Sequence, residues 1–119
     1  MPLVRIDVIA PKSPDYRRAV LRGVRGAITG AFGVDDDRVS LRLIETPDDD
    51  VDLPSCRTER LTVIEVLMYE GRTPEMKRAM ATAAREALSA DPGIEPSEVQ
   101  IAFHEFSKTD LDVPPGATS

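Results

Sequence analysis

Residues 3–45 read LVRIDVIAPKSPDYRRAVLRGVRGAITGAFGVDDDRVSLRLIE, and residues 63–105 read VIEVLMYEGRTPEMKRAMATAAREALSADPGIEPSEVQIAFHE. The two stretches align without a gap at an offset of 60 residues, and eight aligned pairs are identical. The identical pairs are Pro14/Pro74, Arg18/Arg78, Ala19/Ala79, Arg25/Arg85, Ala27/Ala87, Gly33/Gly93, Val39/Val99 and Glu45/Glu105. Self-similarity of this kind indicates that one supersecondary unit occurs twice in the chain.

Each copy begins with a predicted strand and continues into a predicted helix. Residues 3–9 and 61–69 are rich in the β-branched residues typical of strands, and the second stretch is the more continuously apolar, so we expect it to be more buried. Ser13 and Thr73 then have the hydroxyl of a helix N-cap, and each precedes a proline and an acid. Apolar residues recur beyond them at the period of an α-helix.

A turn and a second strand complete each copy. Gly33 and Gly93 follow the two helical stretches, and residues 39–43 and 99–103 alternate between apolar and other side chains. Each copy is therefore a β-α-β unit, which requires its two strands to be parallel.

The predicted fold class is α+β with two layers: a four-stranded mixed sheet carries two helices on one face. We expect a single domain over residues 1–119, with repeats 3–45 and 63–105 joined by the polar linker 46–60. Helices on one face leave the other face of the sheet uncovered. Because the strands have more apolar positions than one face needs, we expect the chain to assemble with copies of itself.

Composition excludes several classes of function. The formal net charge of -6 repels phosphate backbones and anionic lipids, and only 4% of the residues are aromatic, so nucleic acid and membrane are poor partners. The single Cys56 and single His104 cannot form a Cys/His zinc site, and the acidic runs 35–37 and 48–50 lack the calcium-loop pattern. We expect no metal, no cofactor and a cytoplasmic location, since no export signal is visible.

Two residues suggest chemistry. Pro2 follows the initiator methionine, and removal of that methionine would leave a secondary amine at the start of a strand. Free α-amino groups titrate near 7.7 to 8.0, so such an amine can act as a general base, although a proline here could also merely precede the strand. Arg72 lies just before a helix cap, where a guanidinium and helix amides together favour a carboxylate, although it could equally be a solvated arginine. His104 is read as structural or interfacial.

The sequence resembles the tautomerase superfamily, typified by 4-oxalocrotonate tautomerase, over nearly the whole chain. The resemblance rests on PLVRID at 2–7, GRTPEMK at 71–77 and VQIAFHE at 99–105, combined with the doubled β-α-β unit. The stretch FGV at 32–34, Asp37 with Arg38, and DPGI at 91–94 make it most similar to the branch that contains malonate semialdehyde decarboxylase.

This resemblance implies a homotrimer and an enzyme that acts on a small anionic carbonyl or enol substrate. Pro2 matches the catalytic proline, Asp37 a catalytic acid and Arg72 the arginine that holds a substrate carboxylate; Arg38 and Lys12 are further candidates for binding. The decarboxylase pattern has a second arginine where this chain has Glu70, which favours enol-keto tautomerisation over decarboxylation. A decarboxylase, hydratase or dehalogenase of a three-carbon acid, and a non-catalytic ferredoxin-like binding module, remain the alternatives.

Overall fold

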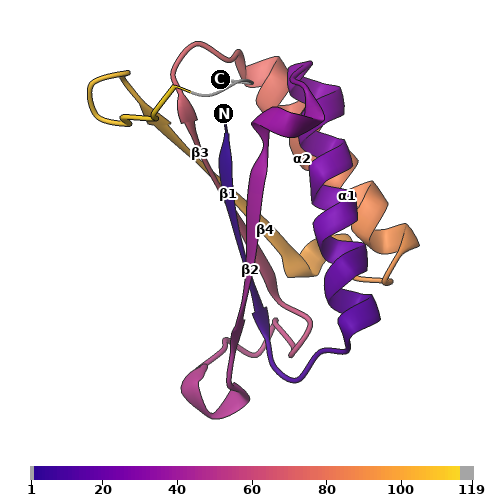
Figure 1. Cartoon of the computed structure of the whole chain (residues 1–119). Coiled ribbons are helices and arrows are strands. Elements are labelled where there is room, and N and C mark those ends of the chain that lie inside the picture. Colours follow the sequence, from indigo (N-terminus) through magenta and orange to yellow (C-terminus); the bar gives the residue numbers. More distant parts are fainter. Residues whose placement is uncertain (1, 116–119) are drawn as a thin grey trace.

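The computed structural model describes residues 2–115 and consists of two β-α-β units (Figure 1). The helices and strands are β1 (Leu3–Ile9), α1 (Pro14–Phe32), β2 (Ser40–Thr46), β3 (Thr62–Tyr69), α2 (Pro74–Ala90) and β4 (Val99–Phe106). Single turns of 3-10 helix lie at Asp36–Arg38, Asp48–Asp50 and Pro96–Glu98. The predicted α+β fold class, with both helices on one face of a four-stranded sheet, is confirmed.

Both helices begin where their capping residues predicted. The Ser13 hydroxyl accepts a hydrogen bond from the Tyr16 amide at 3.1 Å, and the Thr73 hydroxyl accepts one from the Met76 amide at 3.2 Å. These bonds satisfy an amide that has no partner within the helix. Gly33 ends α1 with a φ of 63°, a left-handed conformation that glycine adopts without a steric penalty.

The sheet order is β2-β1-β3-β4. Within each unit the strands are parallel, as β-α-β connections require, so β1 pairs with β2 and β3 pairs with β4. The two units meet where β1 and β3 run antiparallel, with Leu3 opposite Leu67 and Asp7 opposite Val63. The start of β1 therefore lies beside the end of β3.

The hydrophobic core lies between the sheet and the two helices. Alternate residues of β1 and β3 face the helices and are at most 2% exposed: Val4, Ile6, Val8, Ile64, Val66 and Met68. They pack against the helix positions Val20, Val24, Ile28, Met80, Ala84 and Leu88. The residues of β3, which was expected to be more buried than β1, alternate between buried and half-buried, because no helix covers the second face of the sheet.

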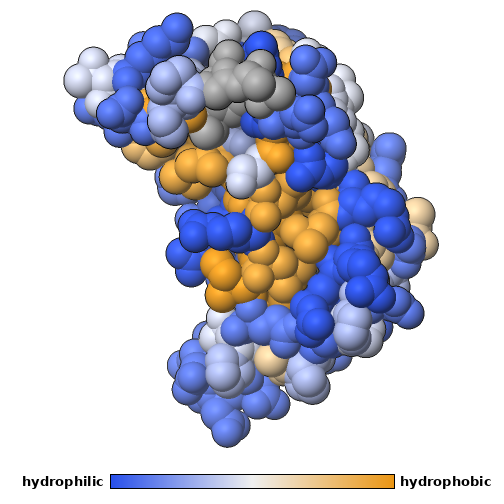
Figure 2. Space-filling model, in the orientation of Figure 1, coloured by the Kyte–Doolittle hydropathy of each residue, from blue (hydrophilic) through white to orange (hydrophobic). Residues whose placement is uncertain are grey.

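The uncovered face of the sheet mixes charged and apolar side chains. Arg5, Arg42 and Glu65 lie side by side on adjacent strands of this face, between half-buried leucines such as Leu67. Figure 2 shows a further gathering of apolar atoms across the middle of the molecule, alongside the edge strand β2 and toward α1. We call the helix-free side of the sheet the open face.

Gly23 provides a test of the helix packing. A Cβ atom at position 23 would lie 3.3 Å from Ala87 Cβ and from Leu88 Cδ2, whereas one at Gly26 would meet nothing within 4 Å. Gly26→Ala is expected to raise the free energy of unfolding by about 0.5–1 kcal/mol, because alanine favours the helix. Gly23→Ala is expected to gain less or to lose stability. Equal gains in chemical denaturation would contradict the close approach of α1 to α2.

Candidate functional site

Pro2 is buried at the start of β1, in the middle of the sheet end. Its carbonyl oxygen accepts a hydrogen bond from the Ser40 amide at 3.2 Å, which ties it to the start of β2. On its other side, the antiparallel pairing of β1 with β3 ends at Leu3 opposite Leu67, two residues before Tyr69. The residues that follow β3 and those that precede β2 therefore lie at the same end of the sheet as Pro2.

Asp37 and Arg38 belong to the 3-10 turn that leads into β2. The Arg25 guanidinium of α1 fixes this turn, since it donates to the Asp36 carbonyl at 2.7 Å and pairs with the Asp36 carboxylate at 3.3 Å. Both Asp37 and Arg38 are exposed and lie two to three residues before Ser40. The turn thus places an acid and a cation at the Pro2 end of the sheet.

Arg72 reaches the same end from the other side, in the connection between β3 and α2. Its guanidinium carbon lies 4.8 Å from the centre of the Phe32 ring, and its Nε is buried without a hydrogen-bond partner among the described residues. Burial lowers the pKa of Arg72, because desolvation disfavours its charged form. An arginine remains protonated in proteins, so a partly desolvated guanidinium here favours an anion.

Glu105 of β4 holds this connection in place. Its carboxylate forms an ion pair and hydrogen bond with the Lys77 ammonium on α2. The Lys77 contact, assisted by a backbone hydrogen bond from Gly71, lowers the pKa of Glu105. The first repeat has the equivalent contact between Glu45 and Arg17, whose Oε1 and Nη1 atoms are 2.6 Å apart. The retained glutamate therefore fixes the loop before each helix.

A cavity of about 530 Å³ brings several of these residues together. It is lined by Val34, Arg38, Tyr69, Arg72, Lys108, Val113 and Pro115. We call it the cationic cavity, because three cations and no acid line it. Within residues 2–115 the side chains of Arg38, Arg72 and Lys108 form no ion pair and no hydrogen bond. The arrangement can bind an anion.

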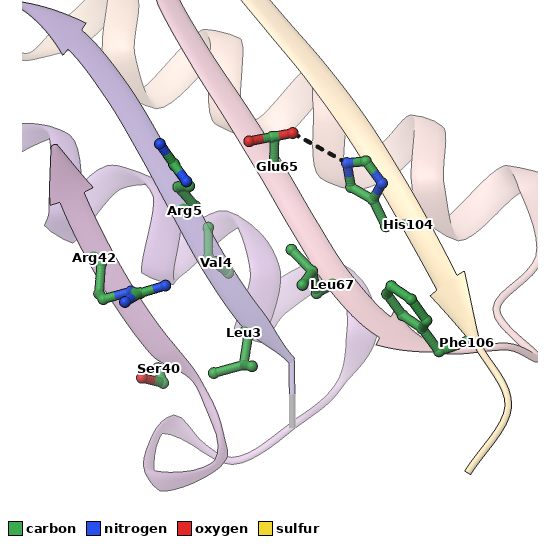
Figure 3. A pocket seen from close by; sticks show the side chains of 9 residues that line it. All are labelled: Leu3, Val4, Arg5, Ser40, Arg42, Glu65, Leu67, His104 and Phe106. Atoms are coloured by element: carbon green, nitrogen blue, oxygen red, sulfur yellow. Dashed lines mark hydrogen bonds and ion pairs between the residues drawn. The ribbon is translucent and has the colours of Figure 1, made fainter. Parts of the chain in front are cut away.

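A second cavity, of about 270 Å³, lies on the open face (Figure 3). Its polar residues are Arg5, Ser40, Arg42, Glu65 and His104, and its apolar walls include Leu3, Leu67 and Phe106. His104 Nε2 lies 3.2 Å from Glu65 Oε1, and Arg5 Nε lies 3.3 Å from Asp7 Oδ2. This open-face cavity adjoins the Pro2 end through Ser40.

Lys12 lies apart from the other candidates. It follows β1, whereas Pro2 precedes it, so the two residues lie at opposite ends of the strand. Lys12 Nζ donates to the Glu59 carbonyl at 3.0 Å and lies 5.3 Å from the centre of the Tyr16 ring. Within one chain the structure does not bring Lys12 to the cationic cavity.

Neither a metal centre nor a membrane span was found in the part of the chain that the structure describes. Residues 2–115 contain no group of three or more His, Cys, Asp or Glu side chains placed to hold a metal ion. None of their helices combines the length and apolar character needed to cross a bilayer.

The family model for tautomerase enzymes matches residues 51–111, which span β3, α2 and β4. The chain belongs to the tautomerase family. This confirms the family resemblance of the sequence. A comparison with curated proteins gives no match.

Solved tautomerase-family structures superpose over almost the whole chain. A malonate semialdehyde decarboxylase inhibited by 3-bromopropiolate is 26% identical, with a TM-score of 0.84 over 98% of this chain and 92% of that one. A fused 4-OT that forms a symmetric trimer is 25% identical, with a TM-score of 0.83 over 98% and 94% of the two chains. Another malonate semialdehyde decarboxylase, 22% identical with a TM-score of 0.85 over 98% and 93%, shares the fold.

Tyr69 and Lys108 line the cationic cavity but were not among the residues predicted from the sequence. Tyr69 appeared only as the last residue of a strand, and Lys108 lies beyond the end of the second repeat. The signal available for Lys108 was its position two residues after β4, a strand that ends at the Pro2 end of the sheet.

Proposed function

We propose that this tautomerase-family protein is an isomerase that interconverts the enol and keto forms of a small carboxylate-bearing substrate. The observation that carries the proposal is a buried Pro2 at the same end of the sheet as a cavity whose cations have no carboxylate partner among the described residues. Membership of a family of enzymes supports a catalytic role. The substrate class follows from the charge of the cavity, since a protein with a net charge of -6 needs local cations to hold an anion.

In the proposed mechanism the Pro2 nitrogen is the general base. It takes the proton of the enol hydroxyl as the carbonyl bond forms, and the electron pair of the carbon–carbon double bond takes up a proton delivered by the prolyl ammonium. Arg72 holds the substrate carboxylate, and Arg38 stabilises the negative charge that develops on oxygen. Asp37 is proposed as a second catalytic group that orients the substrate or a water. The base requires removal of Met1, which lies outside the described residues.

Decarboxylation of a three-carbon acid is the second candidate. It is supported by the 26% identical malonate semialdehyde decarboxylase, whose inhibitor is itself a three-carbon carboxylate. Glu70 opposes it, because this exposed acid stands two residues before Arg72, at the position where the decarboxylase pattern has a second arginine. Release of carbon dioxide from malonate semialdehyde without turnover of enols would favour this candidate.

Pro2→Ala tests the base. Alanine leaves a primary amine of different basicity and geometry, so we expect kcat/KM for enol substrates such as 2-hydroxymuconate and phenylenolpyruvate to fall on the order of 10²-fold. In the wild type, kcat/KM should fall as pH drops below the pKa of the amine, since protonation removes the base. Intact mass should show that Met1 is absent. Full activity in Pro2→Ala, or in a protein that retains Met1, would exclude this mechanism.

Arg72→Ala tests the anion site. We expect a higher KM and a lower kcat for a carboxylate-bearing enol, with kcat/KM reduced roughly 10- to 100-fold, the scale of a charged hydrogen bond. Arg78→Ala is the matched control, because Arg78 lies on α2 with 71% of its side chain exposed and pairs only with Glu75 in the described chain. Equal kcat/KM values for wild type and Arg72→Ala would remove Arg72 from the site.

The proposed assembly is a homotrimer, supported by the uncovered open face and by the fused 4-OT trimer of the same fold. Leu67→Glu places a charge among the half-buried residues of the open face and is expected to yield monomers. Ser89→Glu, on the exposed side of α2, is the control that should leave the assembly intact. Light scattering at micromolar concentration measures the mass. A wild-type mass of 13.0 kDa would contradict the trimer.

A further inference from the structure

We propose that Lys108 is a specificity residue of the cationic cavity, and that it selects substrates carrying a second anionic group beside the carboxylate held by Arg72. This inference rests on the proposed function for its catalytic consequence, but its prediction about binding stands independently. Two observations support it: Lys108 lies on a turn fixed by hydrogen bonds, and the cavity is lined by three cations and no acid.

Lys108 lies in a turn that is fixed at both ends. The amides of Asp110 and Leu111 donate to the Ser107 carbonyl at 3.2 and 3.1 Å, which closes the turn around the lysine. The Tyr69 hydroxyl donates to the Leu111 carbonyl at 2.9 Å and thereby ties the turn to the end of β3. A lysine on a fixed turn loses less conformational freedom when it binds an anion than one on a free tail.

The side chain of Lys108 is itself directed toward the cavity wall. Its Nζ lies 6.0 Å from the centre of the Tyr69 ring, and both residues line the cationic cavity. The other residues of the segment after β4 that line the cavity, Val113 and Pro115, are apolar. This segment therefore adds one charge and an apolar surface to a cavity whose other cations come from before β2 and after β3.

The use of cations elsewhere in the chain makes this cluster unusual. Of the fifteen Lys and Arg side chains, seven form ion pairs within residues 2–115 and four others donate to backbone carbonyls. Three of the four that do neither line this one cavity. Six acids lie in the adjoining segments, and none of them lines the cavity: Asp35, Asp36, Asp37, Glu70, Asp110 and Asp112.

A single carboxylate cannot satisfy this cluster. Paired with Arg72, it leaves two cations in one cavity that repel each other, and a second anionic group on the same ligand removes this repulsion. The cavity of about 530 Å³ has room for a ligand of several carbons with an anionic group at each end. In the proposed mechanism Arg72 holds the single carboxylate and Arg38 stabilises the charge that develops on oxygen. Lys108 has no role with a monoanionic substrate and is free to bind a second anionic group.

Calorimetric binding of adipate and hexanoate, two unreactive six-carbon acids that differ by one carboxylate, tests the inference directly. We expect the wild type to bind adipate at least tenfold more tightly than hexanoate. Lys108→Gln should lose most of this preference by weakening adipate about tenfold, with hexanoate unchanged. Lys108→Arg should retain the preference because it keeps the charge, and Arg78→Gln is the control for loss of a surface cation that does not line the cavity.

Turnover provides the second measurement. We expect Lys108→Gln to raise KM for the dicarboxylate 2-hydroxymuconate and to leave KM for the monocarboxylate phenylenolpyruvate unchanged. A wild type that prefers adipate but turns over neither enol would contradict the proposed function and leave the role of Lys108 intact. A wild type with no preference for adipate, or a Lys108→Gln variant that weakens both acids equally, would overturn the role of Lys108.

Discussion

The antiparallel pairing of β1 with β3 is the constraint on which the site depends. It joins the two β-α-β units into one sheet, and its register, with Leu3 opposite Leu67, decides which loops share an end of the molecule. The start of β1 meets the connection that follows β3, so Pro2 and Arg72 come to the same end although they are far apart in sequence. A pairing of the units through other strands would separate the predicted base from the predicted anion site.

The same pairing gives the molecule two related ends, of which one holds the proposed site. The residue that corresponds to Pro2 in the second unit is Thr62, which is fully buried and whose hydroxyl donates to the Arg60 carbonyl at 3.0 Å. The counterpart of Arg38 is Glu98, which is 7% exposed and accepts a hydrogen bond from the Thr58 amide at 2.9 Å. An acid stands where the first unit has a cation, and the nitrogen of Thr62 is an amide, which cannot act as the base proposed for Pro2. The repeat thus retains its framework, including the Glu45 and Glu105 contacts, while the sites diverge.

The elements of the fold could be read from the sequence because local signals agreed with the tertiary structure. Both helices begin at Ser13-Pro14 and Thr73-Pro74, because the hydroxyl of each cap residue accepts a hydrogen bond from an amide in the first turn. Lys12 illustrates the limit of that reasoning: it aligns with Arg72 in the repeat, yet the antiparallel pairing sends it to the far end of the sheet. Lys108 lies outside the repeat, so the internal symmetry carried no information about it. Its place in the cavity depends on the contact between Tyr69 and Leu111, which only the folded chain creates.

Charge is segregated in this acidic chain, and the segregation follows from what each cation can reach. Cations on the helices find acids one turn away or on the next element, as Arg18 and Arg22 do with Asp15 and Asp91. The cations that pair with neither an acid nor a backbone carbonyl in residues 2–115 are Arg38, Arg72 and Lys108 at the Pro2 end, and Arg42 on the open face. Arg42 stands next to Arg5 across the β1–β2 pair, a like-charge contact that costs free energy in an isolated chain. In the proposed assembly, a neighbouring copy that covers the open face would therefore have to bring negative charge to Arg5 and Arg42, or enclose an anion between the two surfaces.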